Sequence, residues 1–169
     1  MKTTRRRMMF LAVKSVLSLI GVFAITVLVH EGAHYLTALA LNVPIAYFRW
    51  FDFKYFAPVF VSASKDNTVG MTAVGYAGGL VAGLLLLSIL ILKRNWLRQS
   101  LYGWLIGFYL ITFGSWQISQ GILEGAFHQV YISNTTNIFS LTYYISFASA
   151  FLGMALYWVL MPRLTNLRV

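Results

Sequence analysis

The sequence contains no cysteine, which excludes disulfide bonds, thiolate metal sites and cysteine nucleophiles. Charged residues are also few: they make up 10% of the 169 residues, whereas a soluble domain carries about a quarter. Hydrophobic residues make up 59%, and the mean hydropathy is +0.73. A small globule has too much surface for its volume to hide so many apolar groups. A soluble globular domain and a disordered chain are therefore excluded, and the sequence predicts an α-helical integral membrane protein.

Acidic residues are scarce, with four Asp and Glu against thirteen Lys and Arg and a formal net charge of +9. A basic chain raises the question of nucleic acid as a partner. The cations, however, stand in short clusters between apolar runs, as membrane proteins place them against anionic headgroups. The clusters are Arg5–Arg7, then Lys93, Arg94 and Arg98, then Arg163 and Arg168. We therefore expect the lipid bilayer, and no nucleic acid, as a partner.

Four apolar runs are candidates to cross the membrane as helices, which takes about 20 residues each. We predict transmembrane helices at about 8–42, 71–92, 101–123 and 138–160, the last stopping at Pro162. The first run follows Arg5–Arg7 as in a signal peptide, but it is longer than the roughly 7–15 apolar residues of such peptides. We predict a single domain over residues 1–169, in a multi-pass protein of the cell (plasma) membrane.

The segment 43–68 differs from these runs because it contains Pro44, Pro58, several charges and many aromatic residues. Aromatic residues of this density suit short β-strands or an interfacial segment better than a membrane span. We predict a short β-strand region between the first and second transmembrane helices.

Only three histidines are present, and two of them flank a glutamate in His30-Glu31-Gly32-Ala33-His34. Positions i and i+4 share one face of a helix, so both imidazoles can bind one zinc ion. Glu31, beside them, can act as the catalytic base that takes a proton from metal-bound water. Ionisable groups near the bilayer centre cost about 2.5–3.5 kcal/mol each, which a metal site compensates. The alternative is a histidine–carboxylate cluster that only holds helices together.

A third ligand has to come from the remaining acids and the last histidine. Asp52 and Asp66 lie in the segment 43–68, where solvated charge is the ordinary explanation. Glu124 has no cation near it in the sequence, and a buried unpaired carboxylate is costly unless a metal lies beside it. We predict Glu124 as the third ligand. His128, four residues on, is left open as a replacement or a supporting residue.

Taken together, these motifs resemble the site-2 protease family of intramembrane zinc metalloproteases, in its small, single-domain branch. That family carries a zinc motif in a transmembrane helix, a glycine-rich second span, and a third ligand in a later Leu-Asp-Gly motif. Similar features here are His30–His34, Ala73–Leu80 and Leu123-Glu124-Gly125, with Glu in place of Asp. The Asn and Pro that precede the family's Leu-Asp-Gly are absent. The resemblance implies a zinc metalloendopeptidase that cleaves in or near a transmembrane segment of a membrane-protein substrate.

Two further features have alternative interpretations. Gln117 and Gln120 occupy the stretch before Glu124, where they can bind substrate or form interhelical hydrogen bonds. Glycines at every fourth position suit close helix packing or a homo-oligomer; they are Gly75, Gly79 and Gly83, Gly103 and Gly107, and Gly121 and Gly125. The alternative function is a non-catalytic membrane protein whose zinc or histidine cluster serves stability or partner binding. A metal transporter is the least favoured function. It would need polar residues along several spans, whereas here they are concentrated around one site.

The positive-inside rule and the family resemblance predict opposite orientations of the chain in the membrane. Nine Lys and Arg lie in the N-terminus, the 93–98 loop and the C-terminus, against three in the segment 43–68. The positive-inside rule then places both termini in the cytoplasm. The family resemblance implies the opposite, with the loop after the zinc motif facing the cytoplasm.

Overall fold

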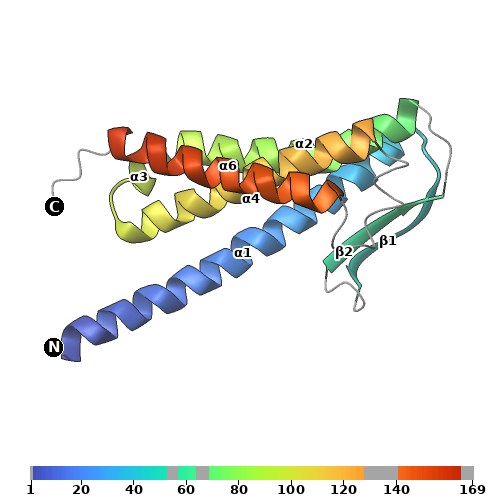
Figure 1. The fold of residues 1–169 in the computed structure, drawn as a ribbon. Helices are drawn as coiled ribbons and strands as arrows, with labels where there is room; N and C mark the ends of the chain where they lie inside the picture. The colour runs from blue at the N-terminus through green and yellow to red at the C-terminus, as the bar shows by residue number, and fades with distance from the viewer. Residues whose placement is uncertain (1, 53–56, 64–68, 128–140, 165–169) are drawn as a thin grey trace.

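The computed structural model describes residues 2–52, 57–63, 69–127 and 141–164. Within these ranges the chain is mostly helical, and a two-stranded antiparallel sheet crosses one end of a helix bundle (Figure 1). The long helices are α1 (Lys2–Ala40), α2 (Val69–Leu92), α4 (Leu101–Ala126) and α6 (Leu141–Leu164). The short helix α3 (Arg94–Leu97) joins α2 to α4. The predicted helices and strand region are therefore present.

Two of the described helices, α1 and α2, are long and apolar enough to cross a membrane. The qualifying stretches are Arg6–Ala40 and Val69–Leu92, and α6 contributes the shorter apolar stretch Tyr144–Val159. Helix α4 has the length, at 26 residues, but its second half carries Gln117, Gln120 and Glu124. On length and composition, two of the four predicted spans stand out among the described residues.

The helix bounds differ most from the prediction at three places. Helix α1 begins at Lys2, because no glycine or proline separates its basic first turns from the apolar run. Helix α4 continues past residue 123, so Glu124 lies within its last turn. Helix α6 passes through Pro162 to Leu164, where we predicted a stop. Pro162 lacks the N–H that would bond to the carbonyl four residues earlier, so α6 loses one helical hydrogen bond there and ends two residues later.

Helix α1 ends in a turn that directs the chain into the sheet. Asn42 has a φ of 52°, the left-handed conformation that asparagine adopts more readily than most residues. The Val43 N–H donates to the Ala38 carbonyl at 2.8 Å, and the Asn42 N–H donates to the Leu39 carbonyl at 3.3 Å. This pair of bonds is a Schellman motif, which satisfies the last carbonyls of the helix. Pro44 follows it and cannot continue the helix.

The sheet pairs β1 (Ile45–Asp52) with β2 (Ala57–Ser62) in antiparallel fashion, and Phe48 lies opposite Phe60. The register is irregular between Ile45 and Tyr47, and again between Arg49 and Asp52. Phe48 stacks on Tyr35 of α1 with ring centroids 4.6 Å apart. The sheet is thereby held against the last turns of α1.

Helices α2 and α4 make the most extensive contact between helices, through glycine. A Cβ atom added at Gly79 would overlap the backbone of Gln117 and Gly121 on α4. One added at Gly75 would lie 2.5 Å from the carbonyl oxygen of Glu124. The two backbones therefore approach almost to contact, as small residues allow in membranes. These glycines of α2 and α4 pack against each other within one chain, and a homo-oligomer stays a prediction.

We expect Gly79→Ala to push α2 away from α4, because backbone atoms of α4 already occupy the position that the added methyl group would take. Overpacking of this kind costs about 1–3 kcal/mol, which lowers the midpoint of thermal unfolding in detergent by several degrees. Gly21→Ala is the matched control, since a Cβ at Gly21 has no atom within 4 Å. Its unfolding midpoint should stay the same or rise. Equal midpoints for the two variants would contradict the backbone contact.

Candidate metal centre

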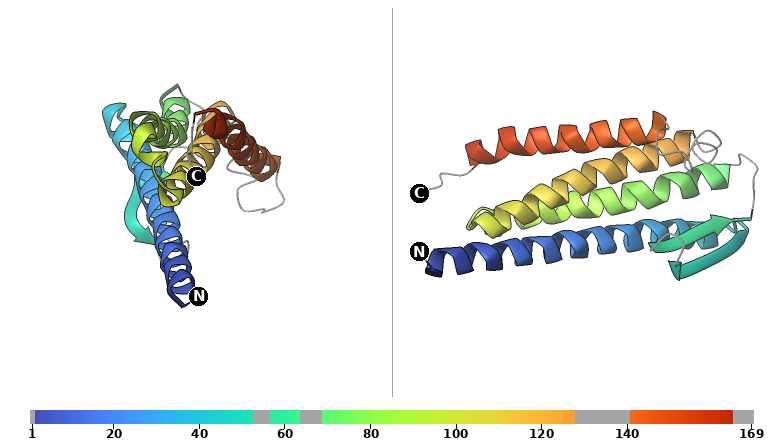
Figure 2. Two further views of the ribbon diagram at one scale, coloured as in Figure 1. Left: turned by 90° about the vertical axis from the view of Figure 1, so that its left-hand side faces the viewer. Right: turned by 60° about the horizontal axis from the view of Figure 1, so that its bottom comes forward.

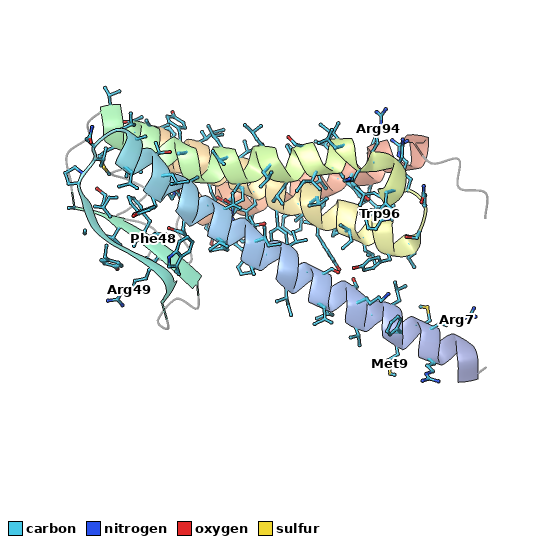
Figure 3. All side chains as sticks on the ribbon, turned by 180° about the vertical axis from the view of Figure 1, so that it is seen from behind. Arg7, Met9, Phe48, Arg49, Arg94 and Trp96 are labelled. Carbon is cyan, nitrogen blue, oxygen red and sulfur yellow. The ribbon has the colours of Figure 1, made fainter. Side chains whose placement is uncertain are left out.

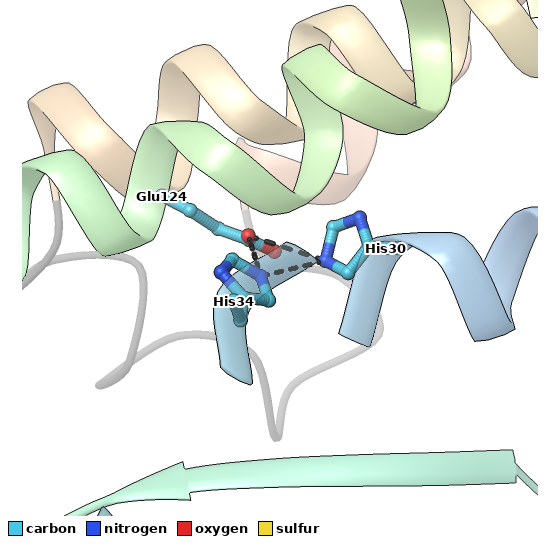
Figure 4. Close-up of side chains that lie close together, drawn as sticks. All are labelled: His30, His34 and Glu124. Atoms are coloured by element: carbon cyan, nitrogen blue, oxygen red, sulfur yellow. Dashed lines mark hydrogen bonds and ion pairs between the residues drawn. The ribbon is translucent and has the colours of Figure 1, made fainter. Parts of the chain in front are cut away.

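Helices α1 and α4 bring His30, His34 and Glu124 together near the sheet (Figure 4). Helix α1 supplies both imidazoles, one turn apart, and α4 supplies the carboxylate from its last turn. Glu124 Oε2 lies 3.3 Å from His30 Nε2 and 3.0 Å from His34 Nε2. The two Nε2 atoms are 3.0 Å apart. The three predicted ligands thus form a group that can hold a metal ion.

These separations suit a small tetrahedral cation. Zinc binds nitrogen and oxygen at about 2.0–2.2 Å, so two of its ligands at a tetrahedral angle lie about 3.3–3.5 Å apart. The observed separations of 3.0–3.3 Å are within a few tenths of an ångström of this value. Calcium prefers about six to eight oxygen ligands, which this pair of imidazoles and one carboxylate does not offer.

Hydrogen bonds behind the imidazoles indicate where their protons lie. His34 Nδ1 is 2.6 Å from the Val74 carbonyl, which can only accept, so Nδ1 donates. His30 Nδ1 is 2.6 Å from Gln117 Oε1, and we assign the proton in the same way. A neutral imidazole with its proton on Nδ1 presents a bare lone pair at Nε2. Both rings therefore turn electron-rich atoms toward each other and toward Glu124.

Burial makes this arrangement unfavourable without a cation. His30 and His34 are each 8% exposed, and the side chain of Glu124 is 13% exposed. Glu124 Oε2 has no hydrogen-bond donor in the part of the chain that the structure describes. A buried carboxylate oxygen without a donor is costly, whereas one that ligates a metal is not. The orphaned oxygen and the two bare nitrogens thus fit a metal site.

Glu31 contacts the sheet and is not part of the group formed by His30, His34 and Glu124. Its Oε2 accepts a hydrogen bond of 2.8 Å from the backbone N–H of Phe60 on β2. The ring of Phe60 also stacks on the imidazole of His34, with centroids 5.8 Å apart and planes at 20°. Strand β2 therefore contacts both the predicted base and a predicted ligand. The role of Phe60 could not be predicted from the sequence, because no residue type signals that a backbone N–H will bind a distant carboxylate.

The two glutamines predicted to bind substrate have different surroundings. Gln117 meets His30, as described, and so lies at the cluster. Gln120 is buried and donates from Nε2 to Ser146 Oγ on α6 at 2.7 Å, the interhelical bond named as its alternative role. Substrate binding by either residue stays a prediction. His128 lies outside the described residues.

Helix α2 leaves room for the imidazole of His34. A Cβ atom added at Gly78 would overlap Nε2, Cε1 and Cδ2 of that ring. Helix α2 thus provides a hydrogen-bond acceptor at Val74 and, one turn later, an open space at Gly78. The sequence marked α2 as rich in glycine, but only the packing shows which glycine faces a ligand.

Comparison with known proteins adds no assignment to this site. No protein-family model matches the chain, and neither does any curated protein or solved structure. The site is therefore interpreted from its own geometry and chemistry.

We expect Gly78→Ala to displace His34 Nε2 and to reduce the zinc that the purified protein retains after dialysis. Gly32→Ala is the control within the histidine motif itself, because a Cβ at Gly32 has no atom within 4 Å. This control should retain about one zinc per chain, measured by elemental analysis. The same zinc content in both variants would contradict the placement of His34 against α2.

We expect Gln117→Leu to weaken zinc binding, because His30 loses the partner that orients its ring and holds its proton on Nδ1. Losing such a partner typically costs about 10–100-fold in metal affinity, which competition with a chromophoric chelator measures. Gln120→Leu serves as the control. It removes a bond between α4 and α6 worth about 1 kcal/mol of stability and should leave the affinity unchanged.

Proposed function

We propose that this chain is an intramembrane zinc metalloendopeptidase of the site-2 protease type. It would hydrolyse a peptide bond in or near a transmembrane segment of a membrane protein. The observation that carries the proposal is the convergence of His30, His34 and Glu124, with the Nδ1 atom of each imidazole hydrogen-bonded to a group outside the cluster. Two histidines and one carboxylate are a donor set of catalytic zinc sites, which keep a fourth position open.

Each residue has a role in this chemistry. Bound zinc would supply a Lewis acid that acidifies a water molecule and polarises the scissile carbonyl. His30, His34 and Glu124 would hold the ion, and Gln117 and the Val74 carbonyl would orient the two imidazoles.

Glu31 would accept the proton of the attacking water and pass it to the leaving amine. The Phe60 N–H donates to its Oε2 and thereby restricts the positions that the carboxylate can take.

The surroundings of the site support a substrate that lies in the membrane. Helices α1 and α2, which flank the cluster, qualify as spans, and their outer faces expose large apolar side chains such as Leu17, Ile20, Leu84 and Ile91. A transmembrane helix hides its own peptide groups, so a substrate has to unwind locally before cleavage. The sheet beside the cluster offers strand edges to which an unwound segment can pair.

A structural cluster is the second candidate function. The bond from Phe60 to Glu31 favours it, because that bond gives Glu31 a part in holding the sheet on α1. In this case a metal ion would only join α1 to α4. The role of Glu31 separates the two candidates.

For an enzyme, we expect Glu31→Gln to retain zinc but to lose cleavage by about 10²–10⁴-fold, the usual contribution of a general base. The amide oxygen of glutamine can still accept the Phe60 N–H, so the fold should be preserved. The assay uses a fluorophore–quencher peptide of about 20 apolar residues in detergent micelles, with His34→Ala as the zinc-free control. If wild type and Glu31→Gln both bind zinc and neither cleaves, the structural candidate stands and the protease is wrong.

A further inference from the structure

The two ends of the bundle differ in what they carry. One end holds the start of α1, helix α3 and the end of α6, and we call it the basic end (Figure 2). The opposite end holds the sheet and the cluster of His30, His34 and Glu124, and we call it the sheet end. Figure 3 shows Arg7 and Arg94 toward the basic end and Arg49 on the sheet.

Charge separates the two ends sharply. The segments of the basic end contain eight cations and no Asp or Glu: Lys2, Arg5, Arg6, Arg7, Lys93, Arg94, Arg98 and Arg163. The segment 43–68 between α1 and α2 contains three cations and two acids. The other two acids of the chain, Glu31 and Glu124, are at the cluster. Positive charge is therefore concentrated at the basic end, whereas the sequence of the segment 43–68 carries nearly balanced charge.

Each end carries an exposed tryptophan, which is typical of the boundary between membrane and water. Trp50 on β1 is 68% exposed and Trp96 on α3 is 50% exposed, as expected of the aromatic residues that anchor proteins at membrane surfaces. Helix α2, which runs between these ends, has 24 residues and is about 36 Å long. That length covers a hydrocarbon core of about 30 Å.

The metal cluster lies close to the sheet end. His34 is six residues from the end of α1 at Ala40, a distance of about 9 Å along the helix. Glu124 lies in the last turn of α4. The start of α1 is more than 25 residues from His30, or roughly 40 Å along the helix. The cluster therefore lies much closer to the sheet end than to the basic end.

We infer that the sheet end faces the outside of the cell, so that the proposed protease acts on membrane-protein segments at the outer boundary of the membrane. Short segments rich in Lys and Arg stay in the cytoplasm, and the two spans α1 and α2 suffice to place the start of α1 and helix α3 there. The part that concerns substrate rests on the proposed function; the orientation does not. This orientation is the reverse of that implied by the family resemblance.

Cysteine labelling tests the orientation, and the full chain has no native cysteine. Trp50→Cys places a thiol on the sheet and Asn95→Cys places one on α3; neither variant alters the charge, and both positions are exposed. A membrane-impermeant maleimide is added to intact spheroplasts and, separately, to permeabilised ones. We expect labelling of Trp50→Cys in intact spheroplasts and of Asn95→Cys only after permeabilisation.

Every other pattern contradicts the inference. Labelling of Asn95→Cys alone in intact spheroplasts would show the reverse orientation, and equal labelling of both would show mixed orientations. Absence of labelling at both positions until permeabilisation would show that the sheet is not on the outer side. Because labelling requires neither zinc nor cleavage, a failed Glu31→Gln test leaves this result unaffected.

Access to the metal is tested from each side on the wild-type protein. An impermeant chelator added to sealed right-side-out vesicles should remove zinc, and in inverted vesicles it should leave zinc in place. The reverse pattern would overturn access from the outside. A protein that contains no zinc in either preparation would refute the metalloprotease, while the labelling result would still decide the orientation.

Discussion

Backbone atoms limit how closely α2 approaches α4 at Gly75, Gly79 and Gly121, where a Cβ on one helix would overlap the backbone of the other. The carbonyl of Glu124 lies against Gly75, so this approach determines how far the Glu124 carboxylate stands from the imidazoles of α1. The same stretch of α2 provides the Val74 carbonyl and the space at Gly78 for His34. A contact wider by one methyl group would separate ligand atoms that are now about 3 Å apart. The metal cluster is therefore a product of helix packing.

The cluster brings together groups that are unfavourable next to one another when no cation is present. Two imidazoles whose protons lie on the far side and a carboxylate oxygen without a donor meet in a largely buried position. Each of these three groups would be more stable in water, but a helix that is otherwise apolar offers no water to solvate them. A bound cation would stabilise all three groups at once. The three donor atoms together therefore indicate a metal site more strongly than any one of them does alone.

Much of this site was accessible from the sequence because its ligands are side chains in regular positions. The spacing of His30 and His34 places them on one helix face, and Glu124 followed from the scarcity of other acids. The groups that orient them were not accessible in this way. The Val74 carbonyl and the Phe60 N–H are backbone groups with no signature of residue type, and their positions depend on how α2 and β2 pack on α1. The bond from His30 Nδ1 to Gln117 Oε1 likewise depends on how α4 is rotated about its axis, which composition does not encode.

The pairing of β1 with β2 has a consequence for the histidine motif. Along a strand, successive N–H groups and side chains point in alternating directions, so only every second residue of β2 can present its N–H to Glu31. A slip of β2 by one residue relative to α1 would withdraw the N–H of Phe60 from Glu31 and turn its ring away from His34. The irregularities on β1 hold the present pairing, since bulges resist such slippage. A chaperone, lipid or drug that shifted this strand by about 3.3 Å would alter the site without touching any of its ligands.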